Sequence, residues 1–570
     1  MKHLQIHIDK YEVQSKEILK SIHFTLNHMD RIAIVGQNGA GKTTLMKILT
    51  GEIQDFQGSI DNIGNLSFGY LAQIYSDNEE KTVFEELKDA FFQVLEMEEN
   101  LKNYEEKMAS GNMEILDEYS SLLEQFNNIG GYDYEKEIHA VANGIGILDL
   151  LEKKLVEVSG GQRTKVALAK VLLVKPDILL LDEPTNFIDL SSVEWLENYL
   201  NTKWFGGFVI ISHDREFLDK TCDKTYELQI TRPINFYHVP YSQYVIEREK
   251  KEKKLLEDYE RQQEWIKDQT GLVNRFRAGS RAGWAKSREK MIERLDKIET
   301  PYIPQKPKFQ FLYGEDSGDK ILNFKGVFIG RKDPLFFINE LTLYKGQKVG
   351  IVGENGVGKS TLLKSIIGQL EILDGYFRKA SSLQVGYYSQ MHEELDKKKT
   401  IKQNFEKHGF FYADQVLSAI LAHYLFSYDD IHKKVGELSG GQITRLHFAI
   451  LGQKETNFLI LDEPTNHLDY DSREALEFAL KKYEGTILFI SHDRYFVNKM
   501  ASHIWFIRES ELSLSYGNYE DYKFKLENGI NMDMSLFNEE AQLNLVLEEK
   551  LGEKNFKRLQ ERFGGKKKRK

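Results

Sequence analysis

The sequence predicts an α/β protein in which two similar domains follow each other on one chain, each built around a P-loop between a strand and a helix. The pattern Gly-x-x-x-x-Gly-Lys-Ser/Thr occurs twice, at residues 36–43 and 353–360. A short apolar run precedes each copy and a helix-like run follows it, which is the context that a phosphate-binding loop requires. The motifs further along recur in the same order, so the chain contains an internal repeat.

The composition excludes several classes of protein. The chain has 570 residues, with 41% hydrophobic and 29% charged residues, which is an ordinary globular composition. Its longest apolar runs, such as residues 178–181 and 208–211, are far shorter than the roughly 18 residues of a membrane helix. Cys222 is the single cysteine, so no intrachain disulfide can form, and the N-terminus alternates like a strand. We therefore expect a cytoplasmic protein without a membrane domain.

Four further motifs follow each loop: a glutamine, a Ser-Gly-Gly-Gln tetrad, an Asp-Glu pair after four apolar residues, and a histidine. Except between the glutamine and the tetrad, their spacing agrees within one residue between the copies. A chance match of one loop is plausible, but a chance match of the whole series twice is not. The two series are Lys42, Gln73, Ser159, Glu183 and His213, and Lys359, Gln390, Ser439, Glu463 and His492.

The loops have the chemistry of phosphate binding. Glycines let successive backbone N–H groups close on phosphate oxygens, and the helix N-terminus adds positive potential. Lys42 and Lys359 would neutralise the β- and γ-phosphates of ATP, and Thr43 and Ser360 would hold Mg²⁺. The residues expected at the nucleotide are Gly36, Asn38, Gly39, Gly41, Lys42, Thr43 and Thr44, and Gly353, Asn355, Gly356, Gly358, Lys359, Ser360 and Thr361.

The acid pairs divide between metal binding and catalysis. Each pair ends an apolar run that is typical of a buried parallel strand. Asp182 and Asp462 suit Mg²⁺, whereas Glu183 and Glu463 suit polarising the attacking water as a general base. The sequence therefore predicts an ATPase with two sites.

The first copy contains about 37 extra residues between its glutamine and its tetrad, and we expect a helical hairpin arm at about residues 83–130. Apolar residues recur every three or four positions on both sides of a break at Gly111-Asn112. Twelve acidic residues against three lysines between Glu85 and Phe126 indicate contact with a protein or a basic surface. The alternative is a solvated hairpin.

A second non-repeated segment, residues 241–305, has the composition of an α-helical linker with a break at residues 278–283. We expect one side of its second helix to carry Trp284, Met291, Leu295 and Ile298. The formal net charge of −11 means that any contact with nucleic acid needs a local basic patch. Such a patch surrounds the break, although an ordinary charged surface is the alternative, and its candidates for RNA contact are Arg275, Arg277, Arg281, Lys286 and Arg288.

The repeat and the two insertions define the expected domains. The first domain spans residues 1–240, the linker 241–305 and the second domain 306–528. Residues 529–570 form a C-terminal extension that ends in a basic tail, for which a solubilising role and RNA contact remain equally open.

These motifs resemble those of the ATP-binding cassette superfamily across both domains. The resemblance implies that each Ser-Gly-Gly-Gln tetrad lies opposite the ATP held by the other domain. The tetrad at residues 439–442 would complete the Lys42 site, and the tetrad at residues 159–162 the Lys359 site. The tetrad residues are Ser159, Gly160, Gly161 and Gln162, and Ser439, Gly440, Gly441 and Gln442.

The resemblance assigns roles to three further pairs of residues. His213 and His492 are similar to the histidines that contact the γ-phosphate. Tyr11 and Phe328 fit the aromatic that stacks on adenine, although each could instead be a strand aromatic of the core. The Q-loop glutamines are implied as metal ligands, so the expected Mg²⁺ ligands are Thr43, Gln73 and Asp182, and Ser360, Gln390 and Asp462.

The Asp-Glu-Pro-Thr-Asn-His-Leu-Asp motif at residues 462–469, the arm and the linker together resemble the F subfamily (ABC-F). That resemblance implies a ribosome-bound translation factor that acts through its linker on tRNA and rRNA at the tRNA exit site. It also implies a monomer whose two domains pair with each other, with the arm against a ribosomal protein. Phe187 stands where histidine is usual, and Val158 where leucine is usual, which we interpret as asymmetry between the sites rather than loss of one. The alternative for Phe187 is a tolerated apolar residue of the loop.

Other functions remain open at this point. An antibiotic-resistance protein that protects the ribosome belongs to the same subfamily, but the moderate linker favours a housekeeping role. The motor subunit of a transporter has no obvious use for a basic linker. A DNA-repair or chromosome ATPase separates its half-domains by much longer coiled coils than this linker of about sixty residues.

Overall fold

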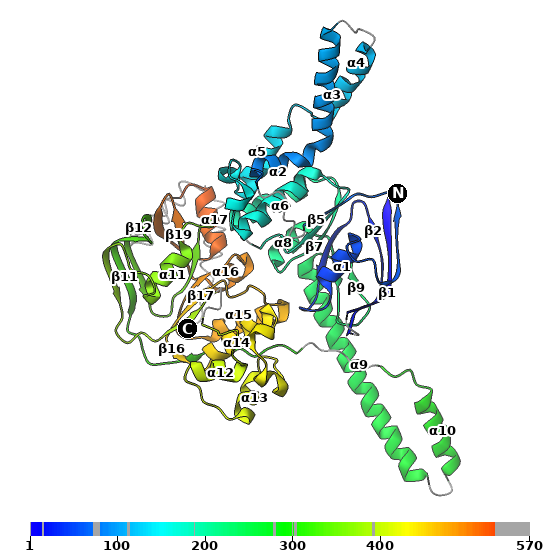
Figure 1. Cartoon of the computed structure of the whole chain (residues 1–570). Helices are drawn as coiled ribbons and strands as arrows, with labels where there is room; N and C mark the ends of the chain where they lie inside the picture. Colours follow the sequence, from blue (N-terminus) through cyan, green and yellow to red (C-terminus); the bar gives the residue numbers. More distant parts are fainter. Residues whose placement is uncertain are drawn as a thin grey trace, which may run out of the picture.

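The computed structural model describes residues 2–13, 16–71, 80–110, 115–186, 188–277, 281–298, 300, 305–389 and 394–530. Two α/β domains lie side by side, and the arm and the linker project from the first domain in different directions (Figure 1). The expected fold class, with its hairpin arm and helical linker, is confirmed.

The first domain is built on two sheets. Its strands are β1 (His3–Val13), β2 (Lys16–Asn27), β3 (Arg31–Val35), β4 (Gln57–Ile63), β5 (Phe68–Leu71), β6 (Ile178–Asp182), β7 (Gly207–Ile211), β8 (Lys224–Glu227) and β9 (Asn235–Tyr237). One sheet has the order β2-β1-β4 and is antiparallel. The other has the order β5-β6-β7-β3-β8-β9 and is parallel except for β9.

The second domain repeats this plan. Its strands are β10 (Leu312–Tyr313), β11 (Lys320–Gly330), β12 (Pro334–Tyr344), β13 (Lys348–Val352), β14 (Asp374–Lys379), β15 (Val385–Tyr388), β16 (Glu455–Thr456), β17 (Phe458–Asp462), β18 (Thr486–Ile490), β19 (His503–Arg508) and β20 (Glu511–Tyr516). A single pairing of Phe337 with Glu511 joins β12 to β20, so the described strands form one sheet in the order β14-β11-β12-β20-β19-β13-β18-β17-β15. Short β10 and β16 pair separately.

Helices cover the parallel sheets on both faces. They are α1 (Lys42–Leu49), α5 (Tyr134–Ile145), α6 (Gly160–Val174), α7 (Leu190–Thr202) and α8 (Arg215–Thr221) in the first domain, and α11 (Lys359–Ile367), α12 (Ile401–Lys407), α13 (Asp414–Ala422), α14 (Gly440–Leu451), α15 (Tyr470–Lys482), α16 (Arg494–Met500) and α17 (Tyr519–Glu527) in the second. Short 3-10 helices are η2 (Leu148–Leu150), η3 (Leu155–Glu157), η4 (Tyr428–His432) and η5 (Val435–Glu437).

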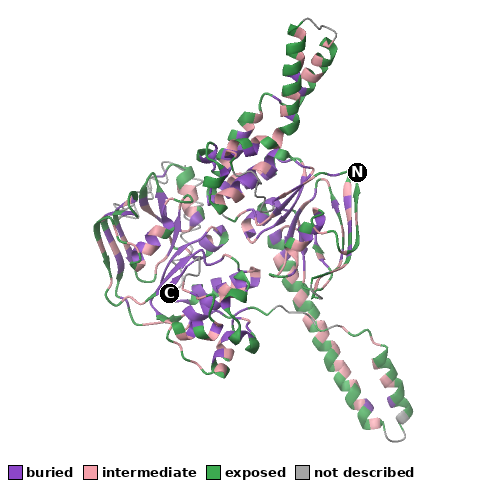
Figure 2. Ribbon diagram, viewed as in Figure 1, coloured by how far each residue is buried: buried purple, intermediate pink, exposed green. Residues whose placement is uncertain are grey.

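Strand β6 shows why its sequence is a continuous apolar run. Ile178 and Leu180 pack into the hydrophobic core on one face of the sheet, whereas Leu179 and Leu181 pack into the core on the other. All four side chains are buried, and buried residues fill the centre of each domain (Figure 2). A strand covered on both faces cannot alternate apolar with polar residues. The acid pair therefore comes at the carboxyl end of the strand, where the chain leaves the sheet.

The arm consists of α2 (Val83–Lys88), the 3-10 turn η1 (Asp89–Phe91), α3 (Phe92–Ala109) and α4 (Leu116–Asn128). Helices α3 and α4 pack against each other through Val94, Leu101 and Phe126, which are buried. The expected first helix is therefore interrupted by η1, and the expected break at Gly111-Asn112 lies outside the described residues.

The linker is a hairpin of the 36-residue helix α9 (Tyr241–Phe276) and α10 (Ala282–Glu293). Leu295 and Ile298 do not lie on the second helix, contrary to the sequence prediction, because α10 ends at Glu293. The chain then runs back along α9, where the side chain of Gln262 accepts a hydrogen bond from the Ile298 N–H (2.8 Å) and donates one to the Asp296 carbonyl (2.9 Å).

The structure bears differently on the C-terminal tail and on the expected absence of a membrane domain. Residues 531–570, which carry the basic tail, are not among the described residues. No helix in the described part of the chain is long and apolar enough to span a membrane.

Candidate functional site

Each glycine-rich loop connects the central strand of its parallel sheet to a helix, β3 to α1 and β13 to α11. Gly41 and Gly358 precede the helices with φ angles of 92° and 110°, in a region that L side chains rarely adopt. A Cβ atom at Gly41 would also lie 2.7 Å from the Leu19 side chain. The glycines are therefore required by the backbone as well as by phosphate chemistry.

The loop lysines lie inside their loops. The Lys42 ammonium donates hydrogen bonds to the carbonyl oxygens of Gly36 (2.8 Å) and Gln37 (3.0 Å). Lys359 makes the same two contacts, at 2.7 and 2.8 Å. Burial lowers the pKa of both lysines, although nearby carboxylates oppose this shift. A phosphate would supply the counter-charge that a partly desolvated ammonium favours.

The hydroxyl and carboxylate expected to hold Mg²⁺ meet in both domains. Asp182 accepts a hydrogen bond from Thr43, and Asp462 accepts one from Ser360. Burial raises the pKa of Asp182 and raises that of Asp462 to about 6, and a bound cation would oppose this shift by favouring the charged carboxylates. Two hard oxygen ligands from the protein, with the rest from phosphate and water, fit Mg²⁺. Gln73 and Gln390 lie outside the described residues.

The two glutamates expected as general bases have matching surroundings. Glu183 and Glu463 have φ angles of 51° and 52°, a strained backbone of the kind found at functional sites. The backbone N–H of His213 donates to Glu183 Oε2 (3.2 Å), and His213 Nε2 lies 3.3 Å from Glu183 Oε1. His492 makes the same contacts with Glu463, at 3.2 and 3.4 Å.

Burial adjusts the proton affinity of these groups. Desolvation raises the pKa of each glutamate to about 7, and the charge of Arg473 opposes this shift at both. Desolvation also lowers the pKa of His213 well below its ordinary value and that of His492 to about 3, so both rings are neutral at pH 7. A carboxylate with a pKa near neutrality is well matched to accept a proton from water.

The tetrads lie at the N-termini of α6 and α14, across the interface from the opposite loops. Ser159 and Ser439 cap these helices by accepting a hydrogen bond from the glutamine N–H of the same tetrad. A cavity of about 850 Å³ between the domains is lined by Ser159, Gly161 and Gln162 together with Lys359 and Ser360. The structure thus brings the first tetrad to the second loop.

The reverse pairing is seen at the other site. Asn38 of the first loop donates a hydrogen bond to the carbonyl oxygen of His467 (3.0 Å), and its amide nitrogen lies close to Gly441 of the second tetrad. Ser439, Gly440 and Gly441 line the same cavity as Asn38. A helix N-terminus aimed at such a cavity is suited to bind phosphate.

The two candidate adenine-stacking residues lie beside their loops on β1 and β11. Tyr11 pairs with Leu19, which packs beneath Gly41. The ring of Phe328 lies 4.8 Å from that of Phe337, and Phe328 is 38% exposed. Neither residue lines the cavity between the domains, so adenine stacking stays a prediction.

The interface contains a reciprocal pair of buried ion pairs that the sequence analysis missed. Arg494 of the second domain, 1% exposed, binds Glu197 on α7 of the first. Arg215 of the first domain lies 3.3 Å from Glu477 on α15 of the second. A signal was present in both copies, since each arginine follows a His-Asp pair and each glutamate lies 14 residues after a candidate general base.

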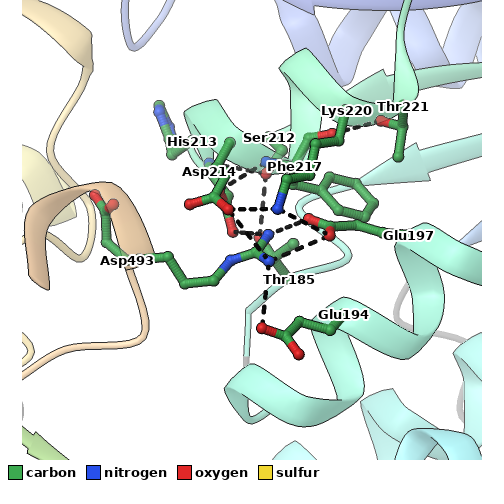
Figure 3. A network of polar contacts seen from close by, with 12 residues as sticks. Thr185, Glu194, Glu197, Ser212, His213, Asp214, Phe217, Lys220, Thr221 and Asp493 are labelled. Carbon is green, nitrogen blue, oxygen red and sulfur yellow. Dashed lines mark hydrogen bonds and ion pairs between the residues drawn. The ribbon is translucent and has the colours of Figure 1, made fainter. Parts of the chain in front are cut away.

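The two ion pairs have different surroundings. Arg494 also lies within 3.9 Å of the carboxylates of Glu194, Asp214 and Glu216. Figure 3 shows this network, in which Glu194, Glu197 and Asp214 of the first domain surround the guanidinium group of Arg494. Arg215 instead lies over the rings of Tyr470 (4.6 Å) and Tyr495 (4.8 Å).

The candidate RNA contacts lie together at the end of the linker hairpin (Figure 1). Arg281 lies over the Phe276 ring (5.4 Å), and Arg288 lies over the Trp284 ring (5.1 Å). Arg277 approaches Glu289 at 3.9 Å, and the side chains of Arg275 and Lys286 are exposed.

Of the two positions that depart from the F-subfamily pattern, the structure describes one. Phe187 lies outside the described residues. Val158 is buried in the core of the first domain, as its counterpart Leu438 is in the second. The Val158 side chain therefore has the same packing role in a smaller volume.

Both domains and the linker match known protein families. A family described as ABC transporter matches residues 19–186 and again residues 338–466, and another with the same description matches residues 231–311. The chain is 38% identical over 89% of its length to the ATP-binding protein YdiF of Bacillus subtilis, and it covers 80% of that protein. It is 33% identical over 92% of its length to ABC transporter F family member 5 of Arabidopsis thaliana, and it covers 77% of that protein.

One solved structure shares the fold over most of both chains. The archaeal ribosome recycling factor aABCE1, in complex with the ribosomal stalk protein aP1, aligns over 92% of each chain with a TM-score of 0.59. The identity is 18%, so this likeness establishes the fold alone.

We predict that Glu183→Gln combined with Glu463→Gln reduces ATP turnover by about 10²–10⁴-fold, because a positioned general base contributes about that much. ATP binding should persist, since the loops and metal ligands are unchanged. Steady-state ATPase rates and nucleotide binding measure this, with the exposed pair Glu152→Gln and Glu371→Gln as the matched control. Near-normal turnover in the first double variant would refute the catalytic assignment.

We also predict that the two sites are unequal. His467 lies at the Lys42 site, whereas Phe187 takes its place in the first copy, and Val158 replaces leucine before the first tetrad. The single variants Glu183→Gln and Glu463→Gln should therefore differ in residual turnover and in how long they retain ATP. Indistinguishable kinetics of the two variants would show that these departures are neutral.

Proposed function

The chain belongs to the ATP-binding cassette superfamily and to its F family, and from this premise we propose that it is a translation factor that binds the ribosome in its ATP-bound, closed form. It is an ATPase with two nucleotide-binding domains, and these domains use ATP, normally with Mg²⁺. The observation that carries the proposal is the exposed cluster of arginines at the tip of the linker.

The tip has the chemistry of an RNA-binding end. Arg281 lies over the Phe276 ring and Arg288 over the Trp284 ring, so both guanidinium groups have an aromatic neighbour at the tip. The rings of Phe276 and Trp284 meet edge to face at 5.8 Å and support them. Arginine pairs with phosphate through two N–H groups and stacks on exposed bases, which suits folded rRNA or tRNA.

The base of the linker touches both domains, which would couple its position to their pairing. Near the start of α9, Arg248 lies 3.1 Å from Glu227 of the first domain and 3.9 Å from Asp471 of the second. The ring of Tyr241 lies 6.2 Å from that of Tyr470. Asp471 and Tyr470 follow directly after the loop that carries His467. Closure of the two domains around ATP would therefore change the contacts that these two residues make with the base of α9.

ATP can supply the free energy that such a switch needs. Moving a two-state protein from mostly open to mostly closed takes about 5.5 kcal/mol of differential binding. Two ATP molecules, each held between a loop and the opposite tetrad, would share this amount. We therefore propose that both sites contribute to ribosome binding, and that the chain acts as a monomer in which its own two domains pair.

The arm supports a second contact with the ribosome. Val94, Leu101 and Phe126 are buried between α3 and α4, whereas most acidic residues of these two helices are exposed. An acidic hairpin repels bare RNA and attracts basic protein surfaces, and we propose a ribosomal protein as its partner. The archaeal factor with the same fold is known in complex with a ribosomal protein, the stalk protein aP1. We propose the tRNA exit site of a cytoplasmic ribosome as the place of binding.

Charge reversal at the tip tests this function. Arg275→Glu, Arg277→Glu and Arg281→Glu, made together in the Glu183→Gln, Glu463→Gln protein, should weaken ribosome binding. Each lost phosphate contact should reduce the slope of log affinity against log salt by about one. Sedimentation with ribosomes over a salt series measures this.

The matched control reverses the same charge elsewhere. Lys397→Glu, Lys398→Glu and Lys399→Glu change three exposed residues of the second domain and should leave binding close to that of the parent. If the tip variant sediments with ribosomes as well as its parent at every salt concentration, the tip is a solvated surface and the proposal fails.

A further inference from the structure

Arg473 lies where the two ATP sites meet. It is on α15 of the second domain, is 6% exposed, and lines the cavity between the domains. Its Nη1 donates a hydrogen bond to the carbonyl oxygen of His213 in the first domain (2.8 Å). The same nitrogen donates to Asp493 Oδ2 (3.1 Å), directly after His492 of the Lys359 site. One guanidinium therefore contacts the histidine segments of both sites.

The contact with His213 bears on the geometry of hydrolysis. The peptide N–H of His213 donates to Glu183 Oε2 (3.2 Å), and its ring lies 3.3 Å from Glu183 Oε1. Arg473 thus holds, from the opposite domain, the residue that orients the general base. This hydrogen bond can exist only when the second domain is paired with the first.

Arg473 also fixes the loop that approaches the first phosphate loop. Its Nε donates to the carbonyl oxygen of Leu468 (3.0 Å). The neighbouring carbonyl, that of His467, accepts the hydrogen bond from Asn38 (3.0 Å). A single side chain therefore connects the loop that touches Asn38 with the histidine that touches Glu183.

The other site has no equivalent arginine. Arg473 lies ten residues after Glu463, and ten residues after Glu183 stands Val193. Val193 is 1% exposed and packs in the hydrophobic core of the first domain, where an aliphatic side chain donates no hydrogen bond. The glutamate–histidine contacts of the two sites are otherwise nearly identical, at 3.3 and 3.4 Å.

We propose that Arg473 is a positioning residue for ATP hydrolysis at the Lys42 site, acting across the interface through the His213 carbonyl, whereas its contact toward the Lys359 site, with Asp493, stays within its own domain. It makes turnover at that site depend on domain pairing in a way that the Lys359 site does not share. This inference rests on the ATPase activity of the chain and is independent of ribosome binding.

Two variants, each with one ATP site inactivated, allow hydrolysis at the other site to be measured alone. Glu463→Gln leaves the Lys42 site competent, and Glu183→Gln leaves the Lys359 site competent. Arg473→Leu is added to each, and ADP formation is followed in a single turnover without ribosomes. In the Lys42 background the rate should fall by about 10²-fold, the cost of a misplacement of about 1 Å. In the Lys359 background it should fall by a smaller factor, because there Arg473 reaches the histidine segment only through Asp493 of its own domain.

Substrate affinity and a conservative variant distinguish positioning from a folding defect. The ATP concentration for half-maximal rate should be unchanged, because none of the hydrogen bonds of Arg473 described above reaches a residue of either phosphate loop. Arg473→Lys keeps the charge and can reach one acceptor, so it should restore part of the rate. Thermal unfolding identifies any variant that misfolds, and Arg473→Gln replaces Arg473→Leu if the latter does.

Two results would overturn the proposal. An equal fall in both backgrounds would show that Arg473 supports the interface as a whole. An unchanged rate in the Lys42 background would show that the His213 carbonyl needs no partner.

Discussion

The pairing of the two domains is the constraint on which both ATP sites depend. Each loop faces the tetrad of the other domain, and we propose on this ground that neither domain alone contains a complete site. Pairing buries charged groups that neither domain could bury alone. Arg494 and Glu197 come from different domains and are nearly inaccessible, as are Arg215 and Glu477. An unpaired buried charge costs several kcal/mol, so the ion pairs and the domain interface form together or not at all.

The same interface connects the candidate nucleotide sites to the linker helix α9. The base of α9 packs against the first domain and touches α15 of the second, whereas its far end carries the basic tip. A helix of 36 residues converts a small rotation at its base into a large displacement at its end. The arm projects from the first domain in a different direction from the linker, so its contacts do not depend on movement of α9 (Figure 1).

The sequence predicted what local periodicity and motif spacing determine. The strand, loop and helix around Lys42 and Lys359, the paired arm helices and the linker hairpin all follow from patterns within short windows. It did not predict the Arg494–Glu197 pair, whose partners are 297 residues apart and meet only through the domain interface. Apolar spacing also continues past Glu293, where the chain has left the helix and its backbone hydrogen-bonds to Gln262 of α9, and periodicity alone cannot distinguish such a segment from a helix.

The central claim is that each ATP lies between the loop of one domain and the tetrad of the other. A structure of the Glu183→Gln, Glu463→Gln protein with Mg²⁺ and ATP tests it most directly. The account predicts two nucleotides, one with its γ-phosphate between Lys42 and Ser439 and one between Lys359 and Ser159, with Mg²⁺ at Thr43 and Ser360. Nucleotides bound to the loops with the opposite tetrads out of contact would contradict it.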